Sequence, residues 1–105
     1  MTQIFTDSSF ESEVLQSDIP VLVDFWGEGC GACRRIAPVI DAVAGAYAGR
    51  VKIGKLDVTT HSQTALRYRI RSIPTLLVFH RGQVVEQRIG AISQAEVEKM
   101  LAGLG

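Results

Sequence analysis

The sequence has few cysteines, no excess of basic residues and no long apolar run, and each shortage excludes a class of protein. Two cysteines in 105 residues are too few for the disulfide framework of a small secreted domain, and too few for a zinc site made of cysteines alone. Eleven Lys and Arg balance eleven Asp and Glu, so the chain lacks the basic surface typical of nucleic-acid binding. We therefore expect neither a nucleic-acid partner nor a metal.

The longest apolar run extends from Ile73 to Phe79 and contains Pro74 and Thr75. It is much shorter than the ~18 residues that a membrane-spanning helix needs. The opening segment MTQIFTDSSF contains neither a basic stretch nor an apolar stretch of signal-peptide length. We therefore expect no membrane association and a cytoplasmic location.

The length of the chain is typical of one domain. Hydrophobic residues make up 47% of the sequence and charged residues 21%, an ordinary balance for a protein with its own core. Internal repeats, low-complexity tracts and linkers are absent from the sequence. Residues 1–105 are therefore expected to form a single domain.

Strand and helix patterns alternate along the chain. The run VLVDFW, residues 21–26, is almost entirely apolar, as in strands of parallel sheets that are buried on both faces. The strand patterns cover residues 3–5, 21–26, 51–58, 75–79 and 83–89, and Arg81-Gly82 predicts a hairpin turn between the last two. With the helices between and after them, the order βαβαβαββα predicts an α/β fold, a central mixed five-stranded sheet flanked by four helices.

Two of the expected helices begin with capping signals. Asp7 or Ser8 is expected to cap the first helix, with Ser8 and Glu11 forming a capping box. Ser93 and Glu96 predict the same arrangement at the start of the last helix.

The two cysteines form one C-x-x-C motif, Cys30-Gly31-Ala32-Cys33, between a buried strand and the next helix. Cysteines three residues apart at a helix start face the same side and can close a disulfide with little backbone movement. Because the closed loop is short, such a disulfide adds little stability and is better suited to exchange. We expect Cys30, which has a glycine on either side, to be the nucleophile and Cys33 to be the resolving thiol.

The helix N-terminus favours the thiolate form of Cys30, because the end of the helix carries partial positive charge. Arg34 and Arg35 add positive charge that opposes the helix dipole; they either support the thiolate or are merely solvated. A structural or metal-binding role is the alternative for the motif. Zinc sites usually need four ligands, and His61 and His80 are far away in the sequence.

Asp24 interrupts an otherwise apolar strand, where an unpaired carboxylate is costly to bury. Lys55 has the strand parity of the apolar Val51 and Ile53, so it can point into the same core and meet Asp24. Burial would raise the pKa of Asp24 and suit it to moving protons for Cys33. The alternatives are an Asp24 that bonds to the backbone and a Lys55 that is exposed at a strand end.

Two long segments of the sequence resemble the thioredoxin family. FWGEGCGACRRIAP, residues 25–38, is similar to the family's active-site segment, and RSIPTLLVFHRGQ, residues 71–83, is similar to its second conserved segment. The likeness extends over nearly the whole chain and includes Asp24, Lys55, Pro74, Gly82 and Gly90. It implies the thioredoxin fold and thiol–disulfide exchange without a bound cofactor.

The resemblance also implies a substrate-binding surface around the cysteines. Pro74 matches the family's cis-proline, and the backbone of Ile73 and Thr75 matches the edge that pairs with an extended substrate peptide. Trp26 matches a tryptophan packed under the active site, and Gly90 matches a glycine of the substrate groove. From the sequence alone these residues could equally be a strand-start proline, a core tryptophan and a turn glycine.

The motif departs from the family pattern at two positions. Gly29 stands where the family usually has Trp, and Ala32 stands where it has Pro. The first change removes a flat apolar surface beside Cys30. The second adds a backbone N–H group and leaves φ free, so we expect a protein that is less reducing than relatives with Pro. We also expect Gly31 and Ala32 to contact substrate.

The predicted function is a protein-disulfide reductase that exchanges electrons through Cys30 and Cys33. The resemblance implies thioredoxin reductase and disulfide-containing client proteins as partners, and a monomer. Two alternatives remain open at this point: a disulfide oxidase or isomerase on the same fold, and a thioredoxin-fold interaction module whose cysteines are incidental.

Overall fold

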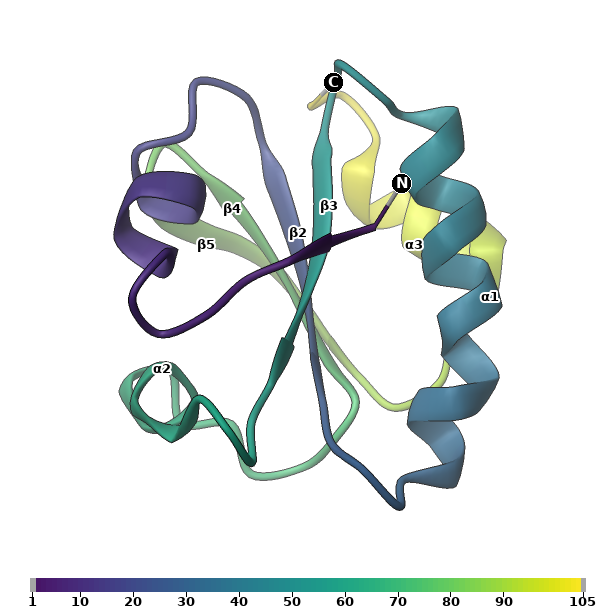
Figure 1. The fold of residues 1–105 in the computed structure, drawn as a ribbon. Helices are drawn as coiled ribbons and strands as arrows, with labels where there is room; N and C mark the ends of the chain where they lie inside the picture. Colours follow the sequence, from purple (N-terminus) through teal and green to yellow (C-terminus); the bar gives the residue numbers. More distant parts are fainter. Residues whose placement is uncertain (1, 105) are drawn as a thin grey trace.

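The computed structural model describes residues 2–104 and contains one five-stranded sheet between two layers of helices (Figure 1). The predicted α/β architecture, a five-stranded sheet flanked by four helices, is confirmed. In chain order the elements are β1 (Gln3–Ile4), η1 (Glu11–Leu15), β2 (Val21–Trp26), α1 (Gly31–Ala46), β3 (Lys52–Asp57), α2 (Ser62–Arg67), β4 (Thr75–His80), β5 (Gln83–Ile89) and α3 (Gln94–Leu101). 

The strand order in the sheet is β1-β3-β2-β4-β5. β1 and β2 both pair with β3 in parallel, whereas β4 runs antiparallel to β2 and β5 antiparallel to β4. The sheet is therefore mixed, as the hairpin at its end predicts. Its central strand β2 is flanked on both sides, which explains why residues 21–25 are all buried and apolar apart from Asp24.

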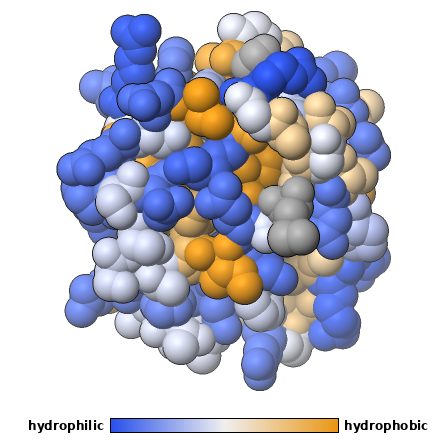
Figure 2. Space-filling view, turned by 45° about the horizontal axis from the view of Figure 1, so that its top comes forward, coloured by the Kyte–Doolittle hydropathy of each residue, from blue (hydrophilic) through white to orange (hydrophobic). Residues whose placement is uncertain are grey.

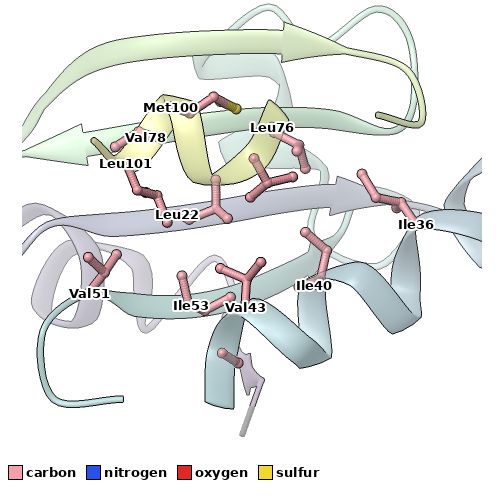
Figure 3. Packing of buried hydrophobic residues seen from close by; sticks show 12 residues of the cluster. Leu22, Ile36, Ile40, Val43, Val51, Ile53, Leu76, Val78, Met100 and Leu101 are labelled. Atoms are coloured by element: carbon pink, nitrogen blue, oxygen red, sulfur yellow. The ribbon is translucent and has the colours of Figure 1, made fainter. Parts of the chain in front are cut away.

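Each face of the sheet has its own core. α1 and α3 cover one face, and η1 and α2 lie over the other (Figure 1). The α1 face packs Leu22 and Ile53 of the sheet against Ile40 of α1 and Leu101 of α3 (Figure 3). The opposite face contains an aromatic group of Phe10, Tyr68 and Phe79, whose ring centroids are 5.2–5.7 Å apart. The two cores fix the position of β2 relative to the start of α1.

The predicted cap of the first helix is wrong. Residues 11–15 form a short π-helix, and neither Asp7 nor Ser8 caps it. Asp7 instead accepts hydrogen bonds at the start of α2, from the N–H of Gln63 at 3.2 Å and the N–H of Thr64 at 2.9 Å. Reciprocal bonds between Thr6 and Ser9 close the turn before η1 instead.

The predicted hairpin turn and the Ser93 cap are confirmed, whereas the hydrogen bonds of the described residues do not include the second bond of the Ser93–Glu96 box, from the Ser93 N–H to the Glu96 carboxylate. The Ser93 hydroxyl accepts from the Glu96 N–H at 3.2 Å at the start of α3. Arg81 and Gly82 both have positive φ, 55° and 80°, as expected for a two-residue hairpin turn that matches the strand twist. α1 extends from Gly31 to Ala46 with Pro38 inside the helix.

Hydrophilic residues cover most of the side of the molecule that Figure 2 shows, and hydrophobic residues form smaller groups among them. No helix within residues 2–104 has the length and hydrophobicity needed to cross a membrane.

Candidate active site

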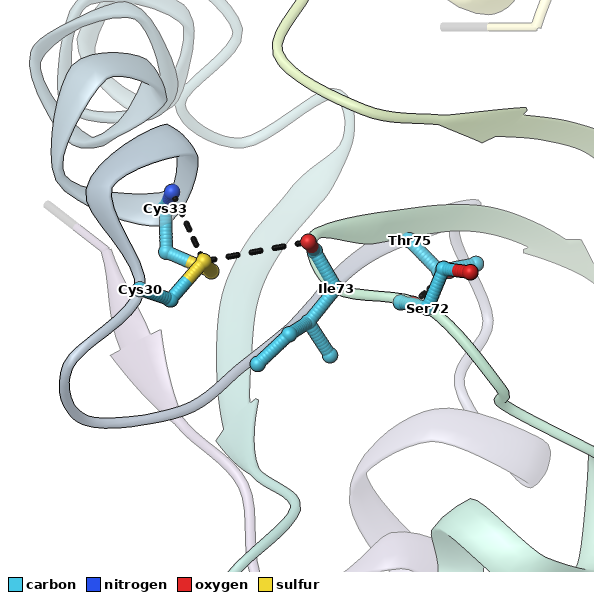
Figure 4. Close-up of a disulfide and its surroundings, with 5 residues drawn as sticks. All are labelled: Cys30, Cys33, Ser72, Ile73 and Thr75. Carbon is cyan, nitrogen blue, oxygen red and sulfur yellow. Dashed lines mark hydrogen bonds between the residues drawn. A yellow bond between two sulfur atoms is a disulfide. The ribbon is translucent and has the colours of Figure 1, made fainter.

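Cys30 and Cys33 form a disulfide at the N-terminus of α1, with their Cα atoms 5.2 Å apart (Figure 4). The carboxyl end of β2 leads directly into this turn, so the sheet determines where the cysteines lie. Sites in α/β sheets commonly form at this position, outside the carboxyl ends of the strands. The structure is that of the oxidised protein.

The two sulfurs are in different environments. Cys30 occupies the N-cap position and is partly exposed, whereas the exposed fraction of Cys33 is 5%. The Cys33 N–H donates a hydrogen bond to the Cys30 Sγ at 3.1 Å, and the helix N-terminus adds partial positive charge. Both features would stabilise negative charge on Cys30 once the disulfide is reduced.

The second predicted segment lies against the disulfide. The peptide bond between Ile73 and Pro74 is cis, and the Ile73 carbonyl oxygen is 3.7 Å from the Cys30 Sγ (Figure 4). Since the sulfur has no proton in the disulfide, this is a close contact in the oxidised protein; the reduced thiol can donate a hydrogen bond along it. The Pro74 carbonyl accepts from the Gly90 N–H at 2.8 Å, which holds Gly90, with φ of 96°, beside the same segment.

Thr75 is less accessible to a substrate than the sequence suggests. It is buried at the start of β4, where it pairs with both Phe25 and Ile89, and its hydroxyl donates to the Ser72 carbonyl. Ile73, by contrast, is partly exposed. The accessible part of the segment is therefore the Ile73 end.

A buried carboxyl lies beneath the disulfide. Asp24 has an exposed fraction of 4%, and its Oδ1 has no hydrogen-bond partner among residues 2–104. Burial raises its pKa to about 7, although Lys55 acts in the opposite direction. Asp24 and Cys33 line the same cavity of about 340 Å³.

The expected ion pair between Asp24 and Lys55 is not formed. The two residues are register partners on β2 and β3 and line the same cavity. Within the described chain, however, the ion pairs of 4.0 Å or less are Lys52–Glu13, Arg88–Glu86 and Lys99–Glu96. The Lys55 ammonium instead lies 5.3 Å from the centre of the Trp26 ring, a geometry that allows a cation–π attraction. Its effect on Asp24 is electrostatic and at longer range.

Two further contributors to the site, Ala37 and Gly27, were not predicted, and Arg34 was expected only to support the thiolate or to be solvated. Arg34 and Ala37, on the first turns of α1, line the cavity beside Cys33. Gly27 leaves room for Ile73, because a Cβ at Gly27 would lie 2.9 Å from the Ile73 Cδ1. The helical spacing of residues 33, 34 and 37 could have indicated Arg34 and Ala37; the Gly27 contact joins segments whose approach no local pattern reveals.

The departures from the family pattern leave the motif open. Gly29 is exposed with φ of 76°, and a Cβ there would meet no atom within 4 Å. Gly31 and Ala32 are partly exposed on the turn between the cysteines. No group of three or more His, Cys, Asp or Glu residues among the described residues could hold a metal ion. The chemistry that the site offers is that of the cysteine pair.

Comparisons with known proteins agree with this geometry. A model of the thioredoxin family matches residues 1–103. The chain belongs to the thioredoxin family. It is 48% identical over 96 residues to thioredoxin 1 of Nostoc sp., an alignment that covers 91% of this chain and 90% of the relative. It is 46% identical over 96 residues to the thioredoxin of Pseudomonas aeruginosa, covering 91% of this chain and 89% of the relative.

Membership of the thioredoxin family and the Cys30–Cys33 disulfide together make the chain a thiol–disulfide oxidoreductase. Thioredoxins act through this redox-active disulfide without a bound cofactor, and the family implies a reductase and disulfide-containing substrates as partners. The prediction of an enzyme is confirmed, and the interaction module with incidental cysteines is not favoured.

Proposed function

We propose that the chain reduces disulfides in client proteins, with Cys30 as the attacking thiol and Cys33 as the resolving thiol. The observation that carries this assignment is the difference in access to the two sulfurs. Cys30 is partly exposed at the helix N-cap, and Cys33 is buried one turn further along α1. A client disulfide can approach Cys30 from solvent, whereas Cys33 can reach only a sulfur already bound to Cys30.

The exchange takes two steps. The Cys30 thiolate attacks one client sulfur, which forms a mixed disulfide and releases the other client sulfur as a thiolate. Cys33, after losing its proton, then attacks the Cys30 sulfur, which forms the Cys30–Cys33 disulfide and releases the second client thiolate. Two electrons pass from the cysteine pair to the client, and the two released thiolates take up protons.

Asp24 is assigned the proton transfer at Cys33. Its carboxyl is buried, lines the same cavity as Cys33 and has a pKa of about 7. A group with such a pKa exists in both forms at neutral pH, so it can accept the Cys33 proton and later return it. Lys55 lies close enough to favour the ionised form of Asp24.

The client peptide is assigned to the segment of Ile73 and Pro74 and to Gly90 beside it. The placement is supported by the Ile73 carbonyl, which is 3.7 Å from the Cys30 Sγ, and by the hydrogen bond that joins Gly90 to Pro74. Trp26 supports the floor of the neighbouring cavity, while Gly31 and Ala32 form the turn that a client would cross. Thr75 contributes through its position in β4, since its side chain is buried.

The cycle closes when thioredoxin reductase returns two electrons to the disulfide. We propose a cytoplasmic monomer for this cycle, as the sequence analysis expects. A monomer is supported by the access that one chain gives to Cys30, because no second copy is needed to complete the site.

The second candidate function is that of a less reducing disulfide oxidase or isomerase. The backbone at Ala32 supports this candidate. Proline at this position would fix φ and remove an N–H group. We expect Ala32→Pro to be more reducing than the parent in equilibrium with defined thiol buffers. A parent potential near or above the cytosolic glutathione poise would favour the oxidase or isomerase.

Trapping of the mixed disulfide tests the assignment of the two sulfurs. Cys33→Ser should accumulate a covalent complex with a disulfide-containing client protein, and Cys30→Ser should form none. Mass spectrometry of the complex identifies the bonded cysteine. If Cys30→Ser forms the stable complex instead, the two roles are reversed.

A further inference from the structure

Two arginine side chains converge on the turn between the cysteines. The Arg35 Nη1 lies 3.6 Å and the Arg34 Nη2 3.8 Å from the position that a Cβ would occupy on Gly31. Gly31 directly follows Cys30, so both guanidinium groups lie at the residue next to the cysteine that we assign as the nucleophile. Both arginine residues are exposed.

Neither guanidinium group has a partner within the described chain. The ion pairs and side-chain hydrogen bonds of residues 2–104 do not include Arg34 or Arg35. The first turn of α1 contains no acidic residue. Glu28 borders the cavity together with Arg34 but is exposed and forms no ion pair of 4.0 Å or less there.

This arrangement is unfavourable for the isolated protein. Two like charges near one point repel each other, and both lie at the helix end where the dipole is already positive. A carboxylate between the two guanidinium groups would remove both effects. Guanidinium groups bind carboxylates through paired N–H···O bonds, which fix position as well as charge.

We propose that Arg34 and Arg35 form a carboxylate-binding rim that selects client disulfides flanked by Asp or Glu. This inference rests on the proposed reduction of protein disulfides. The acidic client side chain binds at Gly31, which holds the adjacent client sulfur over Cys30 for attack. Both arginines act as positioning residues, since neither touches the reacting sulfurs in this scheme.

A general effect on the Cys30 thiolate is the alternative role for the arginines, and it makes a different prediction. Charges that stabilise the thiolate change the rate with every disulfide, whatever its flanking residues. Charges that bind a client carboxylate change the rate with acidic clients only, and salt screens this effect.

The experiment uses three synthetic disulfide-linked peptides that differ only in the residue beside the cysteine: Glu, Gln or Lys. The prereduced protein is mixed with each peptide, and the second-order rate of peptide reduction is followed at low and high salt. The variant Arg34→Gln/Arg35→Gln removes the rim. Arg50→Gln/Arg88→Gln removes two charges from exposed positions elsewhere, in the turn after α1 and on β5, and is the matched control.

We expect the parent and the control to reduce the Glu peptide about fivefold faster than the Gln peptide at low salt, and the Lys peptide slowest. High salt should reduce the preference, and the rim variant should lose it, so that its rates on the Glu, Gln and Lys peptides become equal to one another. Equal rates of the parent on all three peptides would overturn the inference. So would a rim variant that slows equally on all three, which would indicate a thiolate effect.

The same data separate this inference from the proposed function. If the parent reduces none of the peptides and Cys33→Ser traps no client, the reductase assignment itself fails. If the parent reduces all three peptides without preference, the reductase assignment stands and only the acidic selectivity is lost.

Discussion

Asp7 and Asp24 are the same side chain in two regions of the fold, and their surroundings give them opposite acidities. Asp7 accepts hydrogen bonds from the Gln63 N–H, the Thr64 N–H and the Thr64 hydroxyl, the last at 2.6 Å. Partial burial raises its pKa, but these donors outweigh that effect and the pKa is lowered. Asp24 is deeply buried, its Oδ1 has no donor, and its pKa rises to about 7.

The comparison shows that hydrogen-bond donors, together with burial, decide what a carboxyl group does in this protein. The lowered pKa keeps Asp7 ionised at neutral pH, and the carboxylate ties the segment before η1 to the N-terminus of α2. Asp24 has no such donor at its Oδ1 and lines the cavity beside Cys33, which is the basis for the proton transfer that we propose. The Asp7 carboxylate serves to hold two segments together, whereas the Asp24 carboxyl can still be protonated.

The largest expected effect is on stability at alkaline pH, through Asp24→Asn. A carboxyl with pKa about 7 in the folded protein and 3.8 in the unfolded chain binds more protons when folded, so stability falls as pH rises between these values. Full ionisation costs the parent up to about 4 kcal/mol. The oxidised variant should therefore gain stability relative to the parent above about pH 8, and urea unfolding from pH 4 to 9 measures the difference.

Asp18→Asn, which changes an exposed carboxylate, controls for the loss of one negative charge. It should not reproduce the gain at high pH. A stability difference between Asp24→Asn and the parent that stays constant from pH 4 to 9 would contradict the raised pKa, and would leave Asp24 similar to Asp7.

The buried position of Asp24 was predictable from sequence, whereas the role of Asp7 was not. Asp24 interrupts a run of apolar residues in a strand pattern, and that local signal is enough to predict burial and a raised pKa. Asp7 precedes a helix and has a capping signal for it, but its partner Thr64 is 57 residues away in sequence. A local pattern cannot distinguish a cap for the next helix from a cap for a distant one.

The same limit applies to the site. The C-x-x-C motif and the cis bond before Pro74 follow from local spacing and from family resemblance, and Cys30 indeed lies at the helix N-cap. The contacts of Gly27 with Ile73, and of both arginines with Gly31, depend on side-chain directions. Strand parity correctly put Asp24 and Lys55 on one face, but it could not tell that Lys55 would lie over Trp26 instead of forming an ion pair.

A smaller effect is expected from Asp7→Ala. The variant leaves the Gln63 and Thr64 N–H groups without their acceptor, and loss of such a cap costs about 1 kcal/mol. Because the pKa of Asp7 is lowered on folding, its contribution is present above the unfolded value of 3.8 and disappears as pH falls through the lower folded value. Urea unfolding at neutral pH measures the stability that the cap contributes, and urea unfolding at strongly acidic pH measures whether that contribution disappears.

Ser8→Ala is the matched control, because Ser8 is exposed and the sequence marked it as a cap for the first helix. It should change stability much less than Asp7→Ala. If Ser8→Ala costs as much, the capping signal acts locally after all, and the distant tie to α2 is not what stabilises this region.

The smallest expected effect concerns the cation near Asp24. Lys55 lowers the pKa of Asp24 against the effect of burial, so Lys55→Gln should move the Asp24 midpoint upward. NMR of the labelled Asp24 carboxyl carbon across a pH series reports this midpoint directly. Lys52→Gln is the control on the same strand, since the Lys52 ammonium bonds to the Glu13 carbonyl at 2.8 Å on the opposite face of β3, and it should leave the midpoint in place.

The outcome decides which of two causes separates Asp24 from Asp7. An upward shift in Lys55→Gln alone means that the carboxyl is balanced between burial and a nearby cation, and that substitutions on β3 can tune its proton affinity. An unchanged midpoint means that burial without hydrogen-bond donors accounts for the whole difference in pKa between Asp24 and Asp7. Lys55 would then act on the site through Trp26, over whose ring it lies, and its replacement would alter the indole environment without altering the pH dependence of exchange.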